Sequence, residues 1–169
     1  MPDIEEVKQY LAQQGISVSE FREPTPTAET AAMAVGCSAA EIAKTVVFMI
    51  GQTPVAVVTC GDVKIKTAKL KHATGLVGKA RLPRADEVRL HTGYAPGGVC
   101  PFLLPGSLRV LIDTSMRRFT TVYAAAGNDH SAVPVNVDQL LELTGGTEVE
   151  VCEPRESNHR VRSSGGLKR

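Results

Sequence analysis

The chain has 169 residues, of which 43% are hydrophobic and 22% charged, and its formal net charge is +1. This composition is typical of one globular domain and excludes a disordered or collagen-like chain, since about 150 residues can bury a substantial core. No apolar run approaches the roughly 18 residues of a membrane span, and residues 1–9 lack the basic and apolar stretches of a signal peptide, so we expect a cytoplasmic protein without membrane contact.

Up to residue 43, apolar residues at helical spacing predict short helices separated by glycine and proline. Ile4, Val7 and Leu11 recur every three to four positions before Gly15, as in an amphipathic helix that ends at a glycine. Thr27 precedes a second helical run as an N-cap residue. The predicted elements are a helix over 4–14, a strand over 16–21, a loop over 22–27, a helix over 28–35 and a helical turn over 38–41.

The rest of the chain alternates strands with short helices. Two apolar runs, residues 44–50 and 55–59, flank a short turn and predict a β-hairpin. Residues 93–107 hold too many glycines and prolines for a regular element, and loops of this length are usually functional or disordered. The other predicted elements are strands at 63–65, 79–82, 108–112, 121–125 and 147–152, and helices over 67–74, 83–92 and 136–144.

Seven or so strands, several of them joined as hairpins, predict an α/β (mixed α+β) fold. We expect one domain with a central mixed, largely antiparallel sheet and short helices around it. The domain is expected over residues 1–152, followed by a flexible basic tail over 153–169 that lacks apolar periodicity and carries a net charge of +3. Neither a G-x-G-x-x-G nor a G-x-x-x-x-G-K-[ST] motif occurs, which excludes the common dinucleotide and P-loop sites.

The cysteines give no sign of a metal or redox site. Cys37, Cys60, Cys100 and Cys152 are widely separated and form no C-x-x-C pair, so we expect reduced, mostly buried thiols, no metal and no cofactor. Aromatic residues make up only 4% of the chain. Any contact with nucleic acid is therefore expected to be electrostatic or backbone-mediated rather than based on an aromatic platform.

Charge is unevenly distributed along the chain. Residues 1–43 carry a net charge of −5, whereas residues 62–84 carry +6. A basic segment favours binding to a polyanion, although charge alone fits an ordinary solvated surface equally well. The lysines that we expect to contact such a partner are Lys64, Lys66, Lys69 and Lys71.

Two features could hold the oxygen atoms of a substrate. The loop Gly93-Tyr-Ala-Pro-Gly-Gly-Val-Cys-Pro-Phe102 contains Gly97 and Gly98, which allow close backbone approach, so that successive N–H groups can bind one oxygen. Lys44 begins an otherwise apolar strand. A cation there is either a rim residue or a ligand for a substrate oxygen or phosphate.

A third feature is the segment Ala124-Ala-Ala-Gly-Asn-Asp-His-Ser131. Its small side chains leave room for a ligand, and Asp129 or His130 could bind an amino or hydroxyl group. A loop histidine is also commonly just solvated, so this segment by itself does not decide a function.

The three features together, in this order and spacing, resemble the YbaK/aminoacyl-tRNA editing domain family over roughly residues 3–152. The G-Y-x-P-G-G motif of residues 93–98 is the most specific part, and Ile42-Ala43-Lys44 supports it. Members of this family are free-standing relatives of the bacterial prolyl-tRNA synthetase insertion domain and deacylate mischarged tRNA. The resemblance implies an aminoacyl-tRNA hydrolase that acts on the aminoacylated acceptor end, with a prolyl-tRNA synthetase as a candidate partner.

The resemblance also implies residue roles. Lys44 matches the functional lysine, Gly97 and Gly98 match the loop that binds the substrate carbonyl, and a water is expected to be the nucleophile. The 127–130 loop matches the rim of the pocket. The residues that we expect to bind the substrate are Phe48, Tyr94, Pro96, Val99, Gly127, Asp129 and His130. The chain departs from the family pattern at Cys100 and at Asn128-Asp129, which leaves the amino acid open among small residues such as alanine or cysteine.

Two other functional classes remain open from the sequence. A cysteine hydrolase would use Cys100 as nucleophile and His130 as base, because both lie on predicted loops. A non-catalytic module would hold an aminoacyl end or another small ligand and leave it intact. No G-x-S-x-G elbow or Ser-His-Asp order indicates a serine hydrolase.

Overall fold

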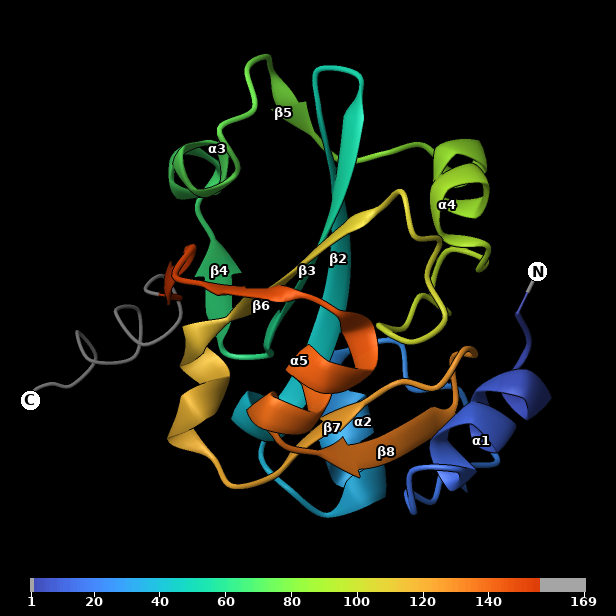
Figure 1. The fold of residues 1–169 in the computed structure, drawn as a ribbon. Helices are drawn as coiled ribbons and strands as arrows, with labels where there is room; N and C mark the ends of the chain where they lie inside the picture. Colours follow the sequence, from blue (N-terminus) through green and yellow to red (C-terminus); the bar gives the residue numbers. More distant parts are fainter. Residues whose placement is uncertain (1, 156–169) are drawn as a thin grey trace, which may run out of the picture.

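The computed structural model describes residues 2–155 and places strand β2 near the centre of an eight-stranded mixed sheet (Figure 1). The strand order is β1-β8-β7-β2-β3-β6-β9, β5 pairs with β2, and β10 and β4 form a separate two-stranded sheet. Three pairings, β2 with β7, β3 with β6 and β6 with β9, are parallel, and the other five are antiparallel. The predicted mixed, largely antiparallel architecture is confirmed.

The described strands number ten rather than about seven. Their bounds are β1 Ser19–Glu20, β2 Ile42–Ile50, β3 Thr53–Cys60, β4 Val63–Ile65, β5 Ala80–Arg81, β6 Arg109–Asp113, β7 Val122–Ala124, β8 Ser131–Val135, β9 Thr147–Val149 and β10 Cys152–Pro154. The predicted hairpin is β2–β3. Strand β8 was not predicted, and β10 includes residues 153 and 154, so the predicted start of the tail falls inside a strand. Residues 156–169 of the predicted tail lie outside the described residues.

The helices begin and end near the residues that the sequence indicates. Asp3, Thr27 and Asn136 each accept a backbone hydrogen bond as N-cap residues. Thr67 is the first residue of its helix, as the predicted range 67–74 indicates. The helices are α1 Ile4–Ala12, α2 Ala28–Val35, α3 Thr67–Thr74, α4 Ala85–Thr92 and α5 Val137–Thr144, with 3₁₀ turns at Ala39–Glu41 and Thr114–Arg118.

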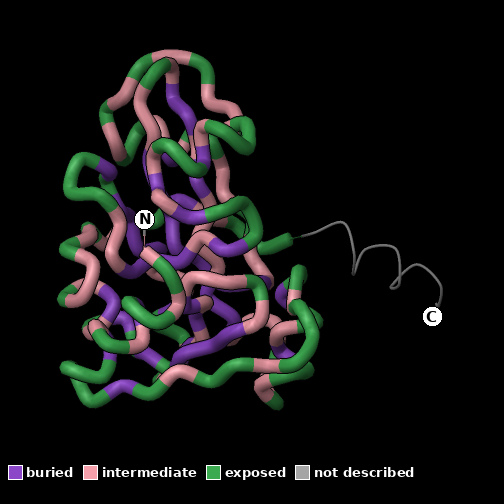
Figure 2. Tube along the Cα trace, turned by 90° about the vertical axis from the view of Figure 1, so that its right-hand side faces the viewer, coloured by how far each residue is buried: buried purple, intermediate pink, exposed green. Residues whose placement is uncertain are grey.

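Strand β3 is buried on both faces of the sheet, which explains its unbroken apolar sequence. Ala56 and Val58 face the larger core cluster, whereas Val55 and Val57 face a second cluster beside α3. In Figure 2 buried residues run through the interior and exposed segments lie outside. Within residues 2–155, no helix combines the length and apolar character needed to cross a membrane.

The sheet divides along one side of β2, and this division positions the site. Strand β7 pairs with β2 only at Ile42 and Ala43, and β5 pairs with it only at Met49 and Ile50. Among the described residues, residues 44–48 therefore have no strand partner on that side. A cavity lies where β7 separates from β2.

Candidate active site

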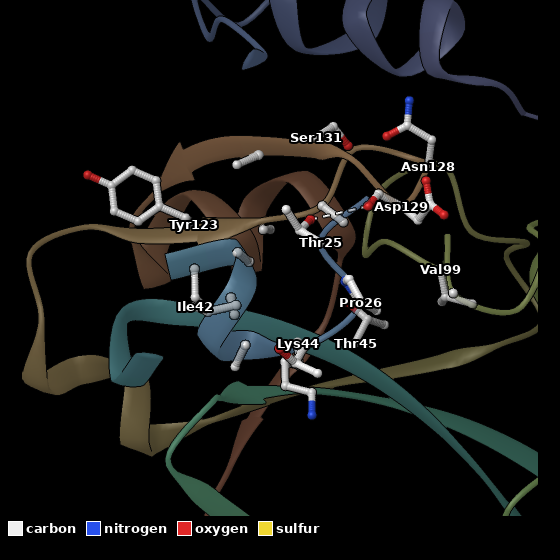
Figure 3. A pocket seen from close by; sticks show the side chains of 18 residues that line it. Thr25, Pro26, Ile42, Lys44, Thr45, Val99, Tyr123, Asn128, Asp129 and Ser131 are labelled. Carbon is white, nitrogen blue, oxygen red and sulfur yellow. Dashed lines mark hydrogen bonds between the residues drawn. The ribbon is translucent and has the colours of Figure 1, made fainter. Parts of the chain in front are cut away.

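The cavity at this division has a volume of about 190 Å³. Figure 3 shows its lining, which comes from the start of β2, the end of β7, the start of β8, the start of α2 and three loops. Most of the wall is small or apolar, as at Ala28, Ala31, Ala124 and Ala125. Such a cavity accommodates a small organic group and excludes a bulky one.

Of the lysines and arginines within residues 2–155, only Lys44 lines the cavity, and its side chain is half-buried. In Figure 3 its ammonium group points away from Asn128 and Asp129. No carboxylate of residues 2–155 lies within 4.0 Å of it, although many other lysines and arginines of the chain are paired. Lys44 is therefore available to bind an anionic or carbonyl oxygen of a ligand at the cavity mouth.

The glycine loop forms a tight turn whose geometry follows from its sequence. The N–H of Gly98 donates to the carbonyl of Ala95 at 2.9 Å, and Gly97 has φ +87°. Proline at the second position and glycine with positive φ at the third are the signature of a type II turn. Gly97 and Val99 line the cavity, but Gly98 does not.

The structure treats the predicted pair of N–H groups at Gly97 and Gly98 differently. The N–H of Gly98 is already used within the turn. The N–H groups of Gly97 and Val99 have no hydrogen-bond acceptor among the described residues. Gly97 and Val99 thus carry the unpaired N–H groups of this turn, and both residues line the cavity.

Gly98 instead brings two loops together. A Cβ at this position would lie 3.3 Å from the carbonyl oxygen of Gly127 and 3.4 Å from the Cα of Asn128. Gly127 has φ +108° and packs against the ring of Tyr94. Both glycines thus hold the 94–99 loop against the 127–130 loop, and their role is structural positioning of the cavity wall.

The 22–27 loop closes the cavity from the other side. Both the backbone N–H and the hydroxyl of Thr25 donate to the carbonyl of Asp129, at 2.7 and 3.2 Å. Thr25 and Pro26 line the cavity. The sequence indicates only a loop for this segment. That it lines the cavity, as Tyr123, Asn128 and Ser131 also do, depends on contacts between residues distant in the chain, which no local pattern reveals.

Asp129 lines the cavity, whereas His130 does not. The Asp129 carboxylate is 52% exposed and lies 3.0 Å from Nδ1 of His130. The Nε2 atom of His130 lies 3.4 Å from the side-chain amide of Asn128. The ring of His130 thus contacts Asp129 and Asn128, two residues of the cavity lining, without lining the cavity itself.

Three other predicted residues lie away from the cavity. Phe48 packs against the second core cluster near Leu70. Pro96 is exposed at the corner of the turn. Tyr94 is buried, its hydroxyl donates to the carbonyl of Phe102, and burial raises its pKa far above the usual range.

Cys100 does not line the cavity and is fully buried, its Sγ facing the carbonyl of Phe102. Burial raises the pKa of its thiol to about 11, so the thiol is protonated at neutral pH. A nucleophilic cysteine needs accessibility and a lowered pKa. The geometry thus argues against the cysteine hydrolase. Within residues 2–155, no three His, Cys, Asp or Glu side chains are grouped as metal ligands.

The predicted basic segment is partly neutralised. Lys66 and Lys69 lie 3.7 and 3.4 Å from the carboxylate of Glu153, and Arg81 forms two hydrogen bonds with Glu87. Lys64 and Lys71 have no ion pair with the described residues. These two lysines retain the charge that would attract a polyanion.

Comparison with known proteins identifies the family. A sequence model of the aminoacyl-tRNA editing domain matches residues 22–143, which include the cavity lining. The chain belongs to the aminoacyl-tRNA editing domain family. The resemblance predicted from the glycine loop and Lys44 is thereby confirmed.

Individual relatives agree with membership of this editing-domain family. The uncharacterized protein YwhH of Bacillus subtilis (strain 168) is 36% identical over 138 residues, which cover 80% of this chain and 87% of YwhH. The crystal structure of a proposed trans-editing enzyme for prolyl-tRNA synthetase superimposes with a TM-score of 0.80 at 29% identity, covering 90% of this chain and 98% of that one. The hypothetical protein APE2540 gives a TM-score of 0.78 at 30% identity, covering 87% and 99%.

Proposed function

We propose that this editing-domain protein is a trans-acting aminoacyl-tRNA deacylase. Its substrate would be a mischarged tRNA, with tRNA(Pro) carrying a small wrong amino acid such as alanine or cysteine as the first candidate, and it would act in the cytoplasm. The observation that carries the proposal is the small-walled cavity that combines Lys44 with the free N–H groups of Gly97 and Val99.

The proposed chemistry is hydrolysis of the ester between the amino acid and the terminal ribose. The ester is already activated, so the protein needs to position it and to stabilise the negative charge that develops on its carbonyl oxygen. The unpaired N–H groups of Gly97 and Val99 would bind that oxygen, and Lys44 would hold the carbonyl or the terminal phosphate. A water attacks the carbonyl carbon, the bond between that carbon and the ribose oxygen breaks, and the ribose oxygen takes up the proton that the water releases.

The polar side of the cavity suits the amino group of the substrate. Asp129 places a carboxylate in the lining, opposite the direction of the Lys44 ammonium. An α-ammonium group would be attracted to Asp129, while the ester oxygens would lie toward the donors. The alanines of α2 and β7 would then surround the side chain and set its maximum size, as in double-sieve editing.

The function can be tested with a panel of tRNA(Pro) species charged with alanine, cysteine, serine or proline. We expect the intact protein to hydrolyse one or more of the small wrong esters and to leave prolyl-tRNA charged, because the cavity walls limit the side chain. The measurement is loss of acid-precipitable labelled amino acid over time. Binding of charged tRNA without hydrolysis of any species would contradict the deacylase and support the non-catalytic binding module.

Lys64→Ala and Lys71→Ala are each expected to raise the KM for charged tRNA about twofold or more at low salt and to reduce the salt slope by about 1. The kcat should stay within about twofold, since neither lysine lines the cavity. Lys8→Ala is the matched control, because Lys8 lies in the acidic segment and pairs with Glu20 at 2.7 Å. Salt slopes equal to that of the unmodified protein for all three variants would show that Lys64 and Lys71 do not contact tRNA.

A further inference from the structure

A second hollow, of about 240 Å³, adjoins the candidate active site. Tyr123 and Ala132 line both cavities, and α2 borders both, with Ala31 at the first and Ala34 at the second. The second hollow is therefore separated from the first by one aromatic side chain and one alanine. In Figure 3 the ring of Tyr123 extends to the side opposite Asn128 and Asp129.

The strand register explains why this hollow is aromatic. Ser19 pairs with Ala132, and Tyr123 pairs with Pro134. Side chains alternate between the two faces of a sheet, so Tyr123, Ala132, Pro134 and Ser19 share one face, and Phe21 follows Ser19 by two positions. This face lies opposite the one from which Val133 and Val135 enter the main core.

The two aromatic residues of the hollow are not used by the large core clusters. The chain has only seven aromatic residues. Phe21 belongs to none of the core clusters, and Tyr123 packs only against the small cluster at α2 and Ile42. The five that pack in or against the two large clusters are Tyr10, Phe48, Tyr94, Phe102 and Phe119.

Covalent connectivity identifies what would occupy the hollow. The ester of an aminoacyl-tRNA is attached to the ribose of the terminal adenosine, so its adenine must lie within one sugar of the aminoacyl group. Aromatic side chains bind bases by stacking on their faces. The cavity with Lys44 has small walls and lacks a free aromatic face other than that of Tyr123, whereas the adjoining hollow has two aromatic walls and a proline.

We propose that the hollow between Phe21 and Tyr123 binds the adenine of the terminal nucleotide while the aminoacyl group occupies the adjoining cavity. The inference rests on the proposed deacylase function for its biological context. Its physical content, recognition of a purine base by this hollow, is independent of hydrolysis. Stacking in this hollow would add an aromatic contact to the tRNA acceptor end, whereas the low aromatic content of the chain predicts only electrostatic or backbone-mediated contacts.

The test is titration of the full chain, labelled with ¹⁵N, with adenosine 5′-monophosphate, followed by amide chemical shifts. We expect shifts concentrated at residues 19–21, 34–35, 123 and 132–135. Ribose 5-phosphate, which lacks the base, should not cause them. Phe21→Ala should weaken binding of the nucleotide at least about fivefold, as expected for loss of one stacking contact. Met33 is 83% exposed on α2 and lies outside the hollow, so Met33→Ala should not weaken binding of the nucleotide.

Deacylation gives a second readout. Phe21→Ala should raise the KM for the best charged tRNA about fivefold and leave kcat within about twofold, because Phe21 does not line the cavity with Lys44. Three results would overturn the inference even if deacylation is observed. They are no shifts up to about 10 mM nucleotide, shifts located elsewhere in the chain, and equal shifts with ribose 5-phosphate. Nucleotide shifts in the hollow without any deacylation would support base binding and count only against the proposed hydrolysis.

Discussion

Lys44→Met is expected to lower kcat/KM for deacylation at least about tenfold, equivalent to about 1.4 kcal/mol of transition-state stabilisation. Methionine keeps most of the aliphatic length of lysine and removes the charge. In the part of the chain that the structure describes, no other lysine or arginine lines the cavity, and no carboxylate neutralises Lys44. The measurement is the rate of hydrolysis of the best substrate from the tRNA(Pro) panel, below its KM.

Two further variants test whether the loss of activity comes from the charge of Lys44. Lys44→Arg should retain part of the activity, because a guanidinium keeps the charge but differs in shape. Lys8→Ala should retain full activity, since Lys8 lies in the acidic segment, pairs with Glu20 and lies outside the cavity. Activity of Lys44→Met within about twofold of the unmodified protein would remove Lys44 from the site.

Local signals predicted most of the fold. Caps at Thr27 and Asn136 and the apolar runs of β2 and β3 depend on neighbours in the sequence, so they were readable from it. Strand β8 was missed because Pro134 reads as a strand breaker. In the structure, β1 pairs with β8 only at Ser131 and Ala132. Pro134 therefore has a strand neighbour only on the β7 side, where it pairs with Tyr123.

The site was predictable where backbone geometry is encoded locally. Proline followed by glycine specifies the type II turn that presents Gly97, and Lys44 interrupts an apolar pattern. Phe48 lies on the same face of β2 as Lys44, but four residues correspond to about 13 Å along a strand, and it packs beside α3 instead. The orientation of His130 depends on Asn128 and Asp129, and the Phe21–Tyr123 hollow depends on strand register, which no local pattern reveals.

Gly61→Ala is expected to lower the free energy of unfolding by about 3 kcal/mol, at the upper end of typical overpacking costs, and the Tm by about 6–12 °C for a chain of this size. A Cβ at Gly61 would collide with the carbonyl oxygen of Ala39 and lie 2.7 Å from the Cβ of Ala28. The first obstacle is backbone, which cannot turn aside as a flexible side chain could. Thermal unfolding followed by circular dichroism measures the effect.

Gly106→Ala is the matched control, because its Cβ would meet no atom within 4 Å and its φ lies outside the left-handed region. It should leave the Tm unchanged or slightly raised. Ala28 is both the first residue of α2 and part of the cavity lining, so relief of the collision by a shift of α2 would also widen or distort the cavity. Gly61→Ala should therefore lose deacylation at temperatures where it remains folded. A Tm within about 2 °C of the unmodified protein, with full activity, would show that Gly61 does not fix the position of α2 against the β3–β4 turn.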